Sequence, residues 1–362
     1  MPPVPPTLSQ SLPFPSEARS QPLPVTSEQL ALVMPTSRAG AAAVILFDET
    51  LRLLELGAGS AQTSRVDKGY LPQVSGGSLQ AIAPAVVPDA CAYLQSRLLV
   101  VYDLAKQRHQ VHMAADDLEE TPVAARWLSV EPRRIAVLVR DLTRYLDTGH
   151  ADFRLRVLDL SGPEAETVGQ LDMGTDGGFV WDAGAGVLVV RKDTEVQVHG
   201  PALDGPMNHP LARALEALLA GSGGLRLERL RLHPTQPVAV FTVAGVASSD
   251  KDKDRDVAGI WRATWDAKDA TLTPLVKLSP LERVKLGEFS PEGGWLTYLQ
   301  TEPGPSRLYA QQVLGTPGPP HALGSLEDAR NLLWTRAPLA LAAVMPRKQL
   351  ITRWDFGRAP GP

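Results

Sequence analysis

The stretch Val284-Lys-Leu-Gly-Glu-Phe-Ser-Pro-Glu-Gly-Gly-Trp-Leu-Thr-Tyr-Leu299 decides the fold of this chain. An alternating strand ends at an aromatic residue, a Ser-Pro-Glu-Gly-Gly turn follows, and a second apolar strand begins. Pro291 sets the φ angle that the first turn position needs, and Gly293 and Gly294 supply positive φ without steric cost. The stretch therefore predicts a β-hairpin.

This strand–turn–strand pattern recurs along the whole chain. One turn residue from each copy gives the series Asp48, Pro88, Pro132, Ala183, Pro234, Pro291 and Pro338. The spacing runs from 40 residues (48 to 88) to 57 residues (234 to 291), against about 40–50 residues for the blades of propellers. Seven units at this period fill the chain with little left over, which favours a propeller over a sandwich.

Two further strands follow most of these turns, for example Leu98–Leu104 and Arg154–Leu160. Four antiparallel strands in each unit make a blade. We therefore predict an all-β chain in which residues 28–358 form a seven-bladed β-propeller. Residues 1–27 are predicted to be a disordered Pro-rich tether, because they cannot bury enough apolar surface to offset the entropy of ordering, and residues 359–362 a tail.

The last copy ends with Gln349–Phe356, apparently one strand short of a blade. Glu28–Met34 is an apolar segment before the first turn and has no blade of its own. An open ring would expose two sheet edges. We therefore predict that Glu28–Met34 pairs as the outer strand of the last blade and closes the ring.

The segment Phe289-Ser-Pro-Glu-Gly-Gly, followed by an apolar strand, resembles the repeat of TolB-type and WD40-like propellers. The resemblance covers most of residues 29–358. It implies a propeller with a binding role, in a fold that hosts both enzymes and scaffolds.

Two insertions interrupt the period. His209–Ala220 has apolar residues at helical spacing and predicts a short amphipathic helix, with Asn208 as a possible cap. Ser248–Asp256 is a highly charged polar loop between two strands of one blade. We expect these insertions to give the propeller its specificity for a protein partner, through the residues Leu211, Arg213, Leu215, Lys251, Lys253 and Arg255.

Metal and cofactor sites find little support in the sequence. The alternating carboxylates Asp250, Asp252, Asp254 and Asp256 resemble the start of a Ca²⁺ loop, but Arg255 occupies the position that needs Gly. We interpret that loop as a solvated hairpin tip. His109 and His112 would point to opposite faces of a strand, and His233 is expected to form local hydrogen bonds. Cys91 is expected to be a small core residue, and no cofactor is predicted.

The sequence also bears on the functional class. It contains no G-x-S-x-G elbow, Rossmann fingerprint or phosphate-binding loop, so no catalytic residue is predicted. The net charge of −4 gives no reason to expect nucleic acid as a partner. No stretch approaches the length of a membrane span. A cytoplasmic location is expected, or a periplasmic one if a leader has been removed.

Our interpretation is a non-enzymatic scaffold for a protein partner, serving a bacterial assembly. The alternative is a propeller that binds a small ligand, or catalyses a reaction, in its central channel. The two differ in an observable way, because the alternative requires several acids or histidines to converge on the inner strands.

Overall fold

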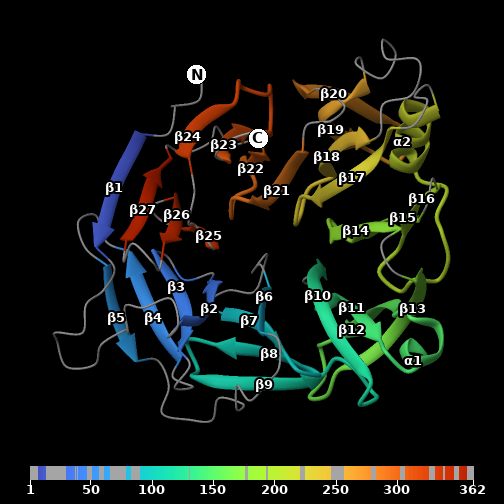
Figure 1. Ribbon diagram of the computed structural model, residues 1–362, viewed down its shortest axis with the longest axis horizontal. Helices are drawn as coiled ribbons and strands as arrows, with labels where there is room; N and C mark the ends of the chain where they lie inside the picture. Colours follow the sequence, from blue (N-terminus) through green and yellow to red (C-terminus); the bar gives the residue numbers. More distant parts are fainter. Residues whose placement is uncertain are drawn as a thin grey trace. The chain divides into compact units, whose positions relative to one another are not determined.

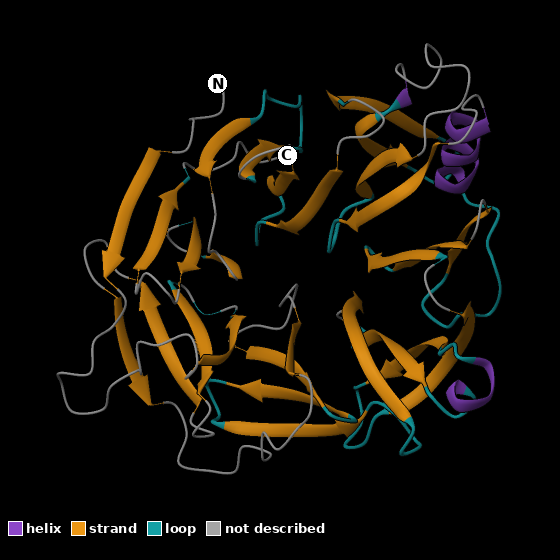
Figure 2. Ribbon diagram, in the orientation of Figure 1, coloured by secondary structure: helices purple, strands orange, loops and turns teal. Residues whose placement is uncertain are grey.

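The computed structural model describes a large part of the chain. The described residues are 7–13, 30–36, 38, 40–46, 51–56, 61–65, 79–82, 90–129, 131–175, 178–192, 195–220, 225–245, 257–278, 283–301, 306–325, 331–336, 339–345 and 350–356. They form seven antiparallel sheets, and the fold is a seven-bladed β-propeller (Figure 1). The helices whose bounds lie within the described residues are α1 (Tyr145–Thr148) and α2 (Pro210–Ala220), drawn in purple in Figure 2. The all-β prediction is therefore confirmed.

The first compact unit consists of Met1–Ala125, Ser290–Glu292 and Leu326–Pro362. It holds the first, second and last sheets. The strands of the first sheet are β2 (Leu30–Pro35), β3 (Ala41–Leu46), β4 (Leu51–Leu56) and β5 (Ala61–Arg65). Those of the second are β6 (Leu79–Ile82), β7 (Ala90–Gln95), β8 (Leu98–Asp103) and β9 (Arg108–Met113). Those of the last are β25 (Asn331–Thr335), β26 (Ala340–Met345), β27 (Leu350–Asp355) and β1 (Thr7–Pro13).

The second compact unit consists of Arg126–Phe289 and Gly293–Ser325, and four sheets lie mainly in it. The third sheet contains β10 (Glu120–Ser129), β11 (Arg134–Asp141), β12 (Asp152–Asp159) and β13 (Glu166–Thr175). The fourth contains β14 (Phe179–Gly184), β15 (Val187–Lys192) and β16 (Glu195–His199). The fifth contains β17 (Leu225–Leu232), β18 (Val238–Gly245), β19 (Gly259–Trp265) and β20 (Ala270–Lys277). The sixth contains β21 (Arg283–Phe289), β22 (Trp295–Thr301), β23 (Arg307–Gln312) and β24 (His321–Ser325).

The apolar residues concentrate in the middle strands of each sheet. In β18 every residue from Val238 to Ala244 is buried, and in β11 the run Ile135–Val139 is buried throughout. The last strand of a sheet has a neighbour on one side only, and β20 accordingly has no buried residue. Cys91 lies in the buried strand β7, and burial raises the pKa of its thiol to about 12. The prediction that Cys91 is a core residue is confirmed.

The prediction that Glu28–Met34 is the outer strand of the last blade is wrong. Leu30–Pro35 forms β2, the first strand of the first sheet, and pairs with β3. The turn of this blade lies at Thr36–Gly40, between β2 and β3, and Asp48 falls one strand later, outside the described residues. The sequence prediction placed the first turn at Asp48, after β3 instead of before it, so the segment that forms β2 had no predicted partner in the first blade. A short connection makes local pairing cost less loop-closure entropy than pairing with the far end of the chain.

An N-terminal strand nevertheless completes the last sheet. It is β1, from within the segment predicted to be a tether, and it pairs antiparallel with β27 from Thr7↔Asp355 to Pro13↔Leu350. The first and last residues of the propeller therefore share one sheet. Residues 14–29 and 357–362 lie outside the described residues, so the tether and the tail stay predictions there.

The fourth sheet has three strands among the described residues, and α2 follows its last strand. Helix α2 contacts β16 of this sheet and β17, β19 and β20 of the next one (Figure 1). The helix predicted at His209–Ala220 is confirmed with a different cap. His209 is the cap, because its Nδ1 accepts a hydrogen bond from the backbone N–H of Leu211 at 3.2 Å. Asn208 accepts a hydrogen bond from Arg213 instead.

The turn of the fifth blade touches the turns of both neighbouring blades. His233 is 1% exposed, and its Nδ1 accepts hydrogen bonds from the backbone N–H groups of Thr235 at 3.1 Å and Gln236 at 3.0 Å. This confirms the local role predicted for His233. Its ring lies so close to Gly293, at φ +77°, that a Cβ there would be 1.6 Å from Nε2. Its carbonyl oxygen would lie 2.6 Å from a Cβ at Gly184. Only glycine permits these two approaches.

Removing β1 tests the pairing in the last sheet. A chain that lacks residues 1–13 should lose about 3 kcal/mol of unfolding free energy, because the backbone hydrogen bonds between β1 and β27 are lost. Urea denaturation of this chain is compared with that of a matched chain lacking only residues 1–6. Equal stability of the two truncated chains would contradict the pairing.

Burial lowers the pKa of His233 to about 4, well under its ordinary value of 6.5. The unfolded chain then binds the proton more readily, so stability is full above pH 6.5 and falls as the pH drops from 6.5 towards 4. The loss should reach about 3 kcal/mol. Urea denaturation of the wild type and of His233→Asn between pH 7 and pH 4.5 measures it, since only the wild type carries this titration. Parallel pH profiles of the two proteins would argue against it.

Candidate functional site

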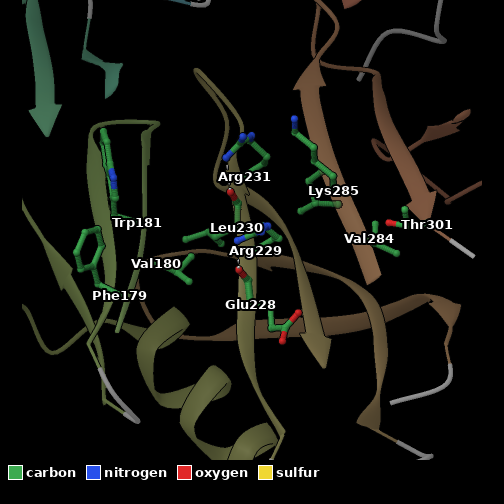
Figure 3. Close-up of a pocket in the computed structure, with 11 residues that line it drawn as sticks. Phe179, Val180, Trp181, Glu228, Arg229, Leu230, Arg231, Val284, Lys285 and Thr301 are labelled. Atoms are coloured by element: carbon green, nitrogen blue, oxygen red, sulfur yellow. Dashed lines mark hydrogen bonds between the residues drawn. The ribbon is translucent and has the colours of Figure 1, made fainter. Parts of the chain in front are cut away.

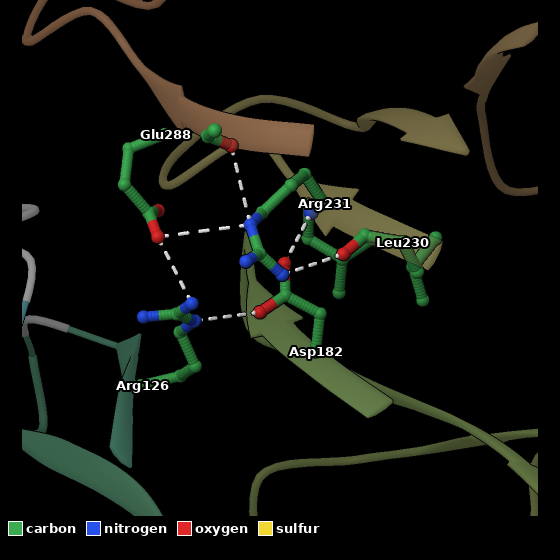
Figure 4. A network of polar contacts seen from close by, with 7 residues as sticks. Arg126, Asp182, Leu230, Arg231 and Glu288 are labelled. Atoms are coloured by element: carbon green, nitrogen blue, oxygen red, sulfur yellow. Dashed lines mark hydrogen bonds and ion pairs between the residues drawn. The ribbon is translucent and has the colours of Figure 1, made fainter. Parts of the chain in front are cut away.

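Four charged side chains from four consecutive blades meet in the second unit (Figure 4). They are Arg126 on β10, Asp182 on β14, Arg231 on β17 and Glu288 on β21. Each stands on the first strand of its sheet, within three residues of the end of that strand. The sign of the charge alternates from one blade to the next. We call this set the inner-strand charge network.

The contacts of the network are short. Arg126 Nε donates to Asp182 Oδ1 at 3.0 Å, and Arg126 Nη2 lies 2.9 Å from Glu288 Oε1. Arg231 Nε lies 3.6 Å from the same Glu288 oxygen. The second Asp182 oxygen, Oδ2, accepts the backbone N–H of Leu232 at 2.7 Å. Both carboxylate oxygens of Asp182 are therefore engaged.

Backbone carbonyl groups hold Arg231 as well. Its Nε donates to the Gly287 carbonyl oxygen at 3.2 Å, and its Nη1 donates to the Leu230 carbonyl oxygen at 2.9 Å. The bond to Gly287 joins β17 to β21, and the two bonds together fix the guanidinium plane. The guanidinium therefore does not depend on the Glu288 carboxylate alone for its orientation.

Burial and pairing act against each other in this network. The Asp182 side chain is only 3% exposed; burial raises its pKa, while Arg231 and Arg126 oppose that rise. For Glu288 burial also acts to raise the pKa, but the guanidinium groups of Arg126 and Arg231 outweigh it and lower the pKa. Burial acts to lower the pKa of Arg126, and the two carboxylates reverse the sign and raise it. Two cations and two anions leave the network neutral.

This arrangement is suited to holding blades together. A carboxylate that acts as a general base needs an oxygen within reach of a substrate proton. Asp182 offers no such oxygen. The acids that the channel alternative requires on the inner strands are present, and they are paired with arginines. None of the four residues was predicted as a site, although the repeats carry a charge of alternating sign one position before Trp127, Ala183, Leu232 and Phe289.

A cleft of about 440 Å³ lies on the first strands of the fourth, fifth and sixth sheets (Figure 3). It shares Arg231 with the inner-strand charge network. Its lining residues are Phe179, Val180, Trp181, Glu228, Arg229, Leu230, Arg231, Val284, Lys285, Leu286 and Thr301. Polar and apolar groups contribute to the lining in similar measure.

The partner residues predicted on α2 lie in two environments. Leu211 and Leu215 are 0% exposed and belong to the core that the fourth and fifth sheets share. A partner cannot reach them, so the prediction is wrong for these two side chains. Arg213 is exposed, and it donates hydrogen bonds to Asn208 Oδ1 and to the Lys268 carbonyl oxygen at 3.1 Å. Helical periodicity shows that a face is apolar, but not whether the fold covers it.

The other predicted positions carry less information. Asp250, Asp252, Asp254 and Asp256, with Lys251, Lys253 and Arg255, lie outside the described residues, so their roles stay predictions. Within the described part of the chain, no three His, Cys, Asp or Glu side chains are grouped so that they could hold a metal ion. The ring centroid of His109 lies 4.4 Å from that of Tyr102. The side chain of His112 is buried. No described helix is long and apolar enough to cross a membrane.

Comparisons with known proteins show the fold. No family model matches the chain, and no curated protein matches it in sequence. Among solved structures, it is similar to an oligogalacturonate lyase from Vibrio parahaemolyticus, with 11% identity, 96% of each chain covered and a TM-score of 0.58. It is also similar to the β-propeller domain of Cps50 (Swd1) from Myceliophteria thermophila, with 11% identity, 90% of this chain and 96% of that chain covered, and a TM-score of 0.51. One of these neighbours is named as an enzyme, so the likeness leaves the functional class open.

Neutralising Asp182 tests the network. Asp182→Asn keeps the shape of the side chain but removes the charge from one of the two carboxylates that bind Arg126. The unfolding free energy should therefore fall by about 2 kcal/mol. The matched control is Asp103→Asn. Asp103 Oδ2 lies 3.2 Å from the Nζ of Lys106, whose side chain is 75% exposed. Loss of this surface ion pair should cost less than about 1 kcal/mol of unfolding free energy. Urea denaturation at pH 7 measures both. Equal losses would mean that the network contributes no more than a surface ion pair.

Proposed function

We propose that this propeller is a non-enzymatic scaffold that binds a protein partner along the outer edge of its second blade. The observation that carries the proposal is a group of exposed apolar side chains on β9 and the loop after it. Val111 is 44% exposed, Met113 48% and Leu118 80%. We call these three residues the blade-two apolar edge. Exposed large apolar side chains close together in the chain favour a protein interface.

The backbone of β9 supports the same function. Among the described residues, β9 is the last strand of its sheet and pairs with β8 alone. Val111 and Met113 alternate with His112, which is buried at 4%, so the two apolar side chains share the face away from the core. An extended segment of another protein can add to such an edge through main-chain hydrogen bonds and place apolar side chains on this face.

Acidic residues beside the blade-two apolar edge indicate the charge that a protein partner should carry. Asp116, Asp117 and Glu119 are exposed in the loop that also carries Leu118. Carboxylates at the rim of an interface favour partners with positive charge at the matching position. We therefore expect an extended apolar segment flanked by Lys or Arg.

The inner-strand charge network supports the non-enzymatic part of the proposal. Its two carboxylates are bound by Arg126 and Arg231, and Asp182 also accepts the Leu232 N–H. A channel enzyme would need such groups to be available to a substrate.

The test is capture of partners by the tagged full-length protein from its native cells, followed by mass spectrometry. We expect a stoichiometric protein that Val111→Glu/Met113→Glu no longer retains, because a buried unpaired charge at the interface costs several kcal/mol. The matched control is Leu146→Glu at a side chain that is 94% exposed on α1, and this variant should retain the protein. If all three chains capture the same proteins in equal amount, the proposal fails.

The same capture tests the predicted charged loop. A chain with Lys251, Lys253 and Arg255 replaced by Ser measures whether that loop adds to the affinity. The identity of the captured protein also tests the hypothesis of a bacterial assembly.

A further inference from the structure

The cleft on β14, β17 and β21 has the size of a site for a small molecule. Its volume of about 440 Å³ lies within the range of about 300–1,000 Å³ for ligand pockets. Three first strands from consecutive blades of one compact unit build it. A rigid sheet scaffold keeps the lining side chains in place before a ligand arrives.

Cations outnumber carboxylates in the lining. Arg229, Arg231 and Lys285 face a single acid, Glu228. Arg229 donates to the backbone carbonyl of Glu228 at 3.2 Å, and neither Arg229 nor Lys285 forms an ion pair with a carboxylate among the described residues. Arg231 is shared with Glu288, whose carboxylate is also bound by Arg126. The cleft therefore carries an excess of positive charge.

The orientation of the cations favours recognition of an anion. Arg231 and Lys285 extend towards the same end of the cleft (Figure 3). Backbone carbonyl groups of Leu230 and Gly287 hold the guanidinium of Arg231 in place. A guanidinium that is already fixed loses little side-chain entropy on binding, and its planar donors match the oxygens of a carboxylate or phosphate.

Apolar side chains complete the lining. Leu230, Val284 and Leu286 are buried, and Val180 is half-buried beside them. An apolar surface beside cations suits a ligand with a compact apolar body and an oxyanion group.

We propose that this cleft binds a small organic anion, with its oxyanion held by Arg229, Arg231 and Lys285 and its apolar body against Val284. The oxyanion is a carboxylate or a phosphate, because both match these donors. The site shares no residue with the blade-two apolar edge and does not depend on the function proposed above.

The experiment titrates the full-length protein with benzoate, phenyl phosphate and benzyl alcohol, and follows binding by NMR. These probes share one ring and differ in their polar group. We expect saturable binding of at least one of the two anions and at least tenfold weaker binding of the neutral alcohol. The anion that binds more tightly identifies the oxyanion.

Variants locate the site. Arg229→Gln/Lys285→Gln should weaken binding of the anion at least tenfold, while Arg226→Gln, an exposed cation on the same strand outside the lining, should leave it unchanged. Arg229 and Lys285 are exposed, so both variants should fold, and thermal denaturation checks this. Three results would each overturn the proposal: no saturable binding of either anion to the wild type, equal affinity for the alcohol, or equal affinity in the wild type and the double variant.

Discussion

The pairing of Arg126 and Asp182 with Arg231 and Glu288 is the interaction on which the second unit depends. Blades of a propeller pack side by side, and the Asp182 carboxylate between them is almost entirely removed from water. A buried charge without a partner costs several kcal/mol. Each acid here lies against an arginine from a neighbouring blade, so a packing of the sheets that separated these partners would leave the buried Asp182 charge unpaired. Asp182, at 3% exposure, makes this constraint strongest between the third and fourth blades.

The turns after the first strands add a second, steric constraint. The N–H of Gly186 donates to the Leu128 carbonyl oxygen at 3.1 Å, and the N–H of Ala185 donates to the Pro234 carbonyl oxygen at 2.9 Å. His233 then lies against Gly293 of the following blade. Backbone hydrogen bonds thus join the fourth blade to the third and the fifth, and the His233 ring joins the fifth to the sixth. Charges and turns act at the same end of the first strands.

The two proposed surfaces differ in physical character. The cleft contains Arg229 and Lys285, which are not part of the neutral network, and it shares Arg231 with that network. The blade-two apolar edge lies on an outer strand, where a sheet has unpaired backbone groups and few packing constraints. The first strands that line the cleft contact one another across blades, β14 with β17 and β17 with β21, whereas β9 is the last strand of its sheet. A small ligand fits the first environment and a protein segment fits the second.

The sequence by itself determined the seven-fold repeat, the all-β class, the helix at Pro210–Ala220 and the core position of Cys91, because strand periodicity, turn residues and helix spacing are local properties. Only the tertiary structure decided that Thr7–Pro13 completes the last sheet and that Leu211 is buried. It also brought Arg126 to Asp182 across 56 residues. These facts depend on which segments become neighbours, and burial and ion pairing exist only once the blades have packed. The sequence allowed two positions for the first turn, between β2 and β3 or after β3, because two consecutive apolar strands fit the strand–turn–strand pattern equally well.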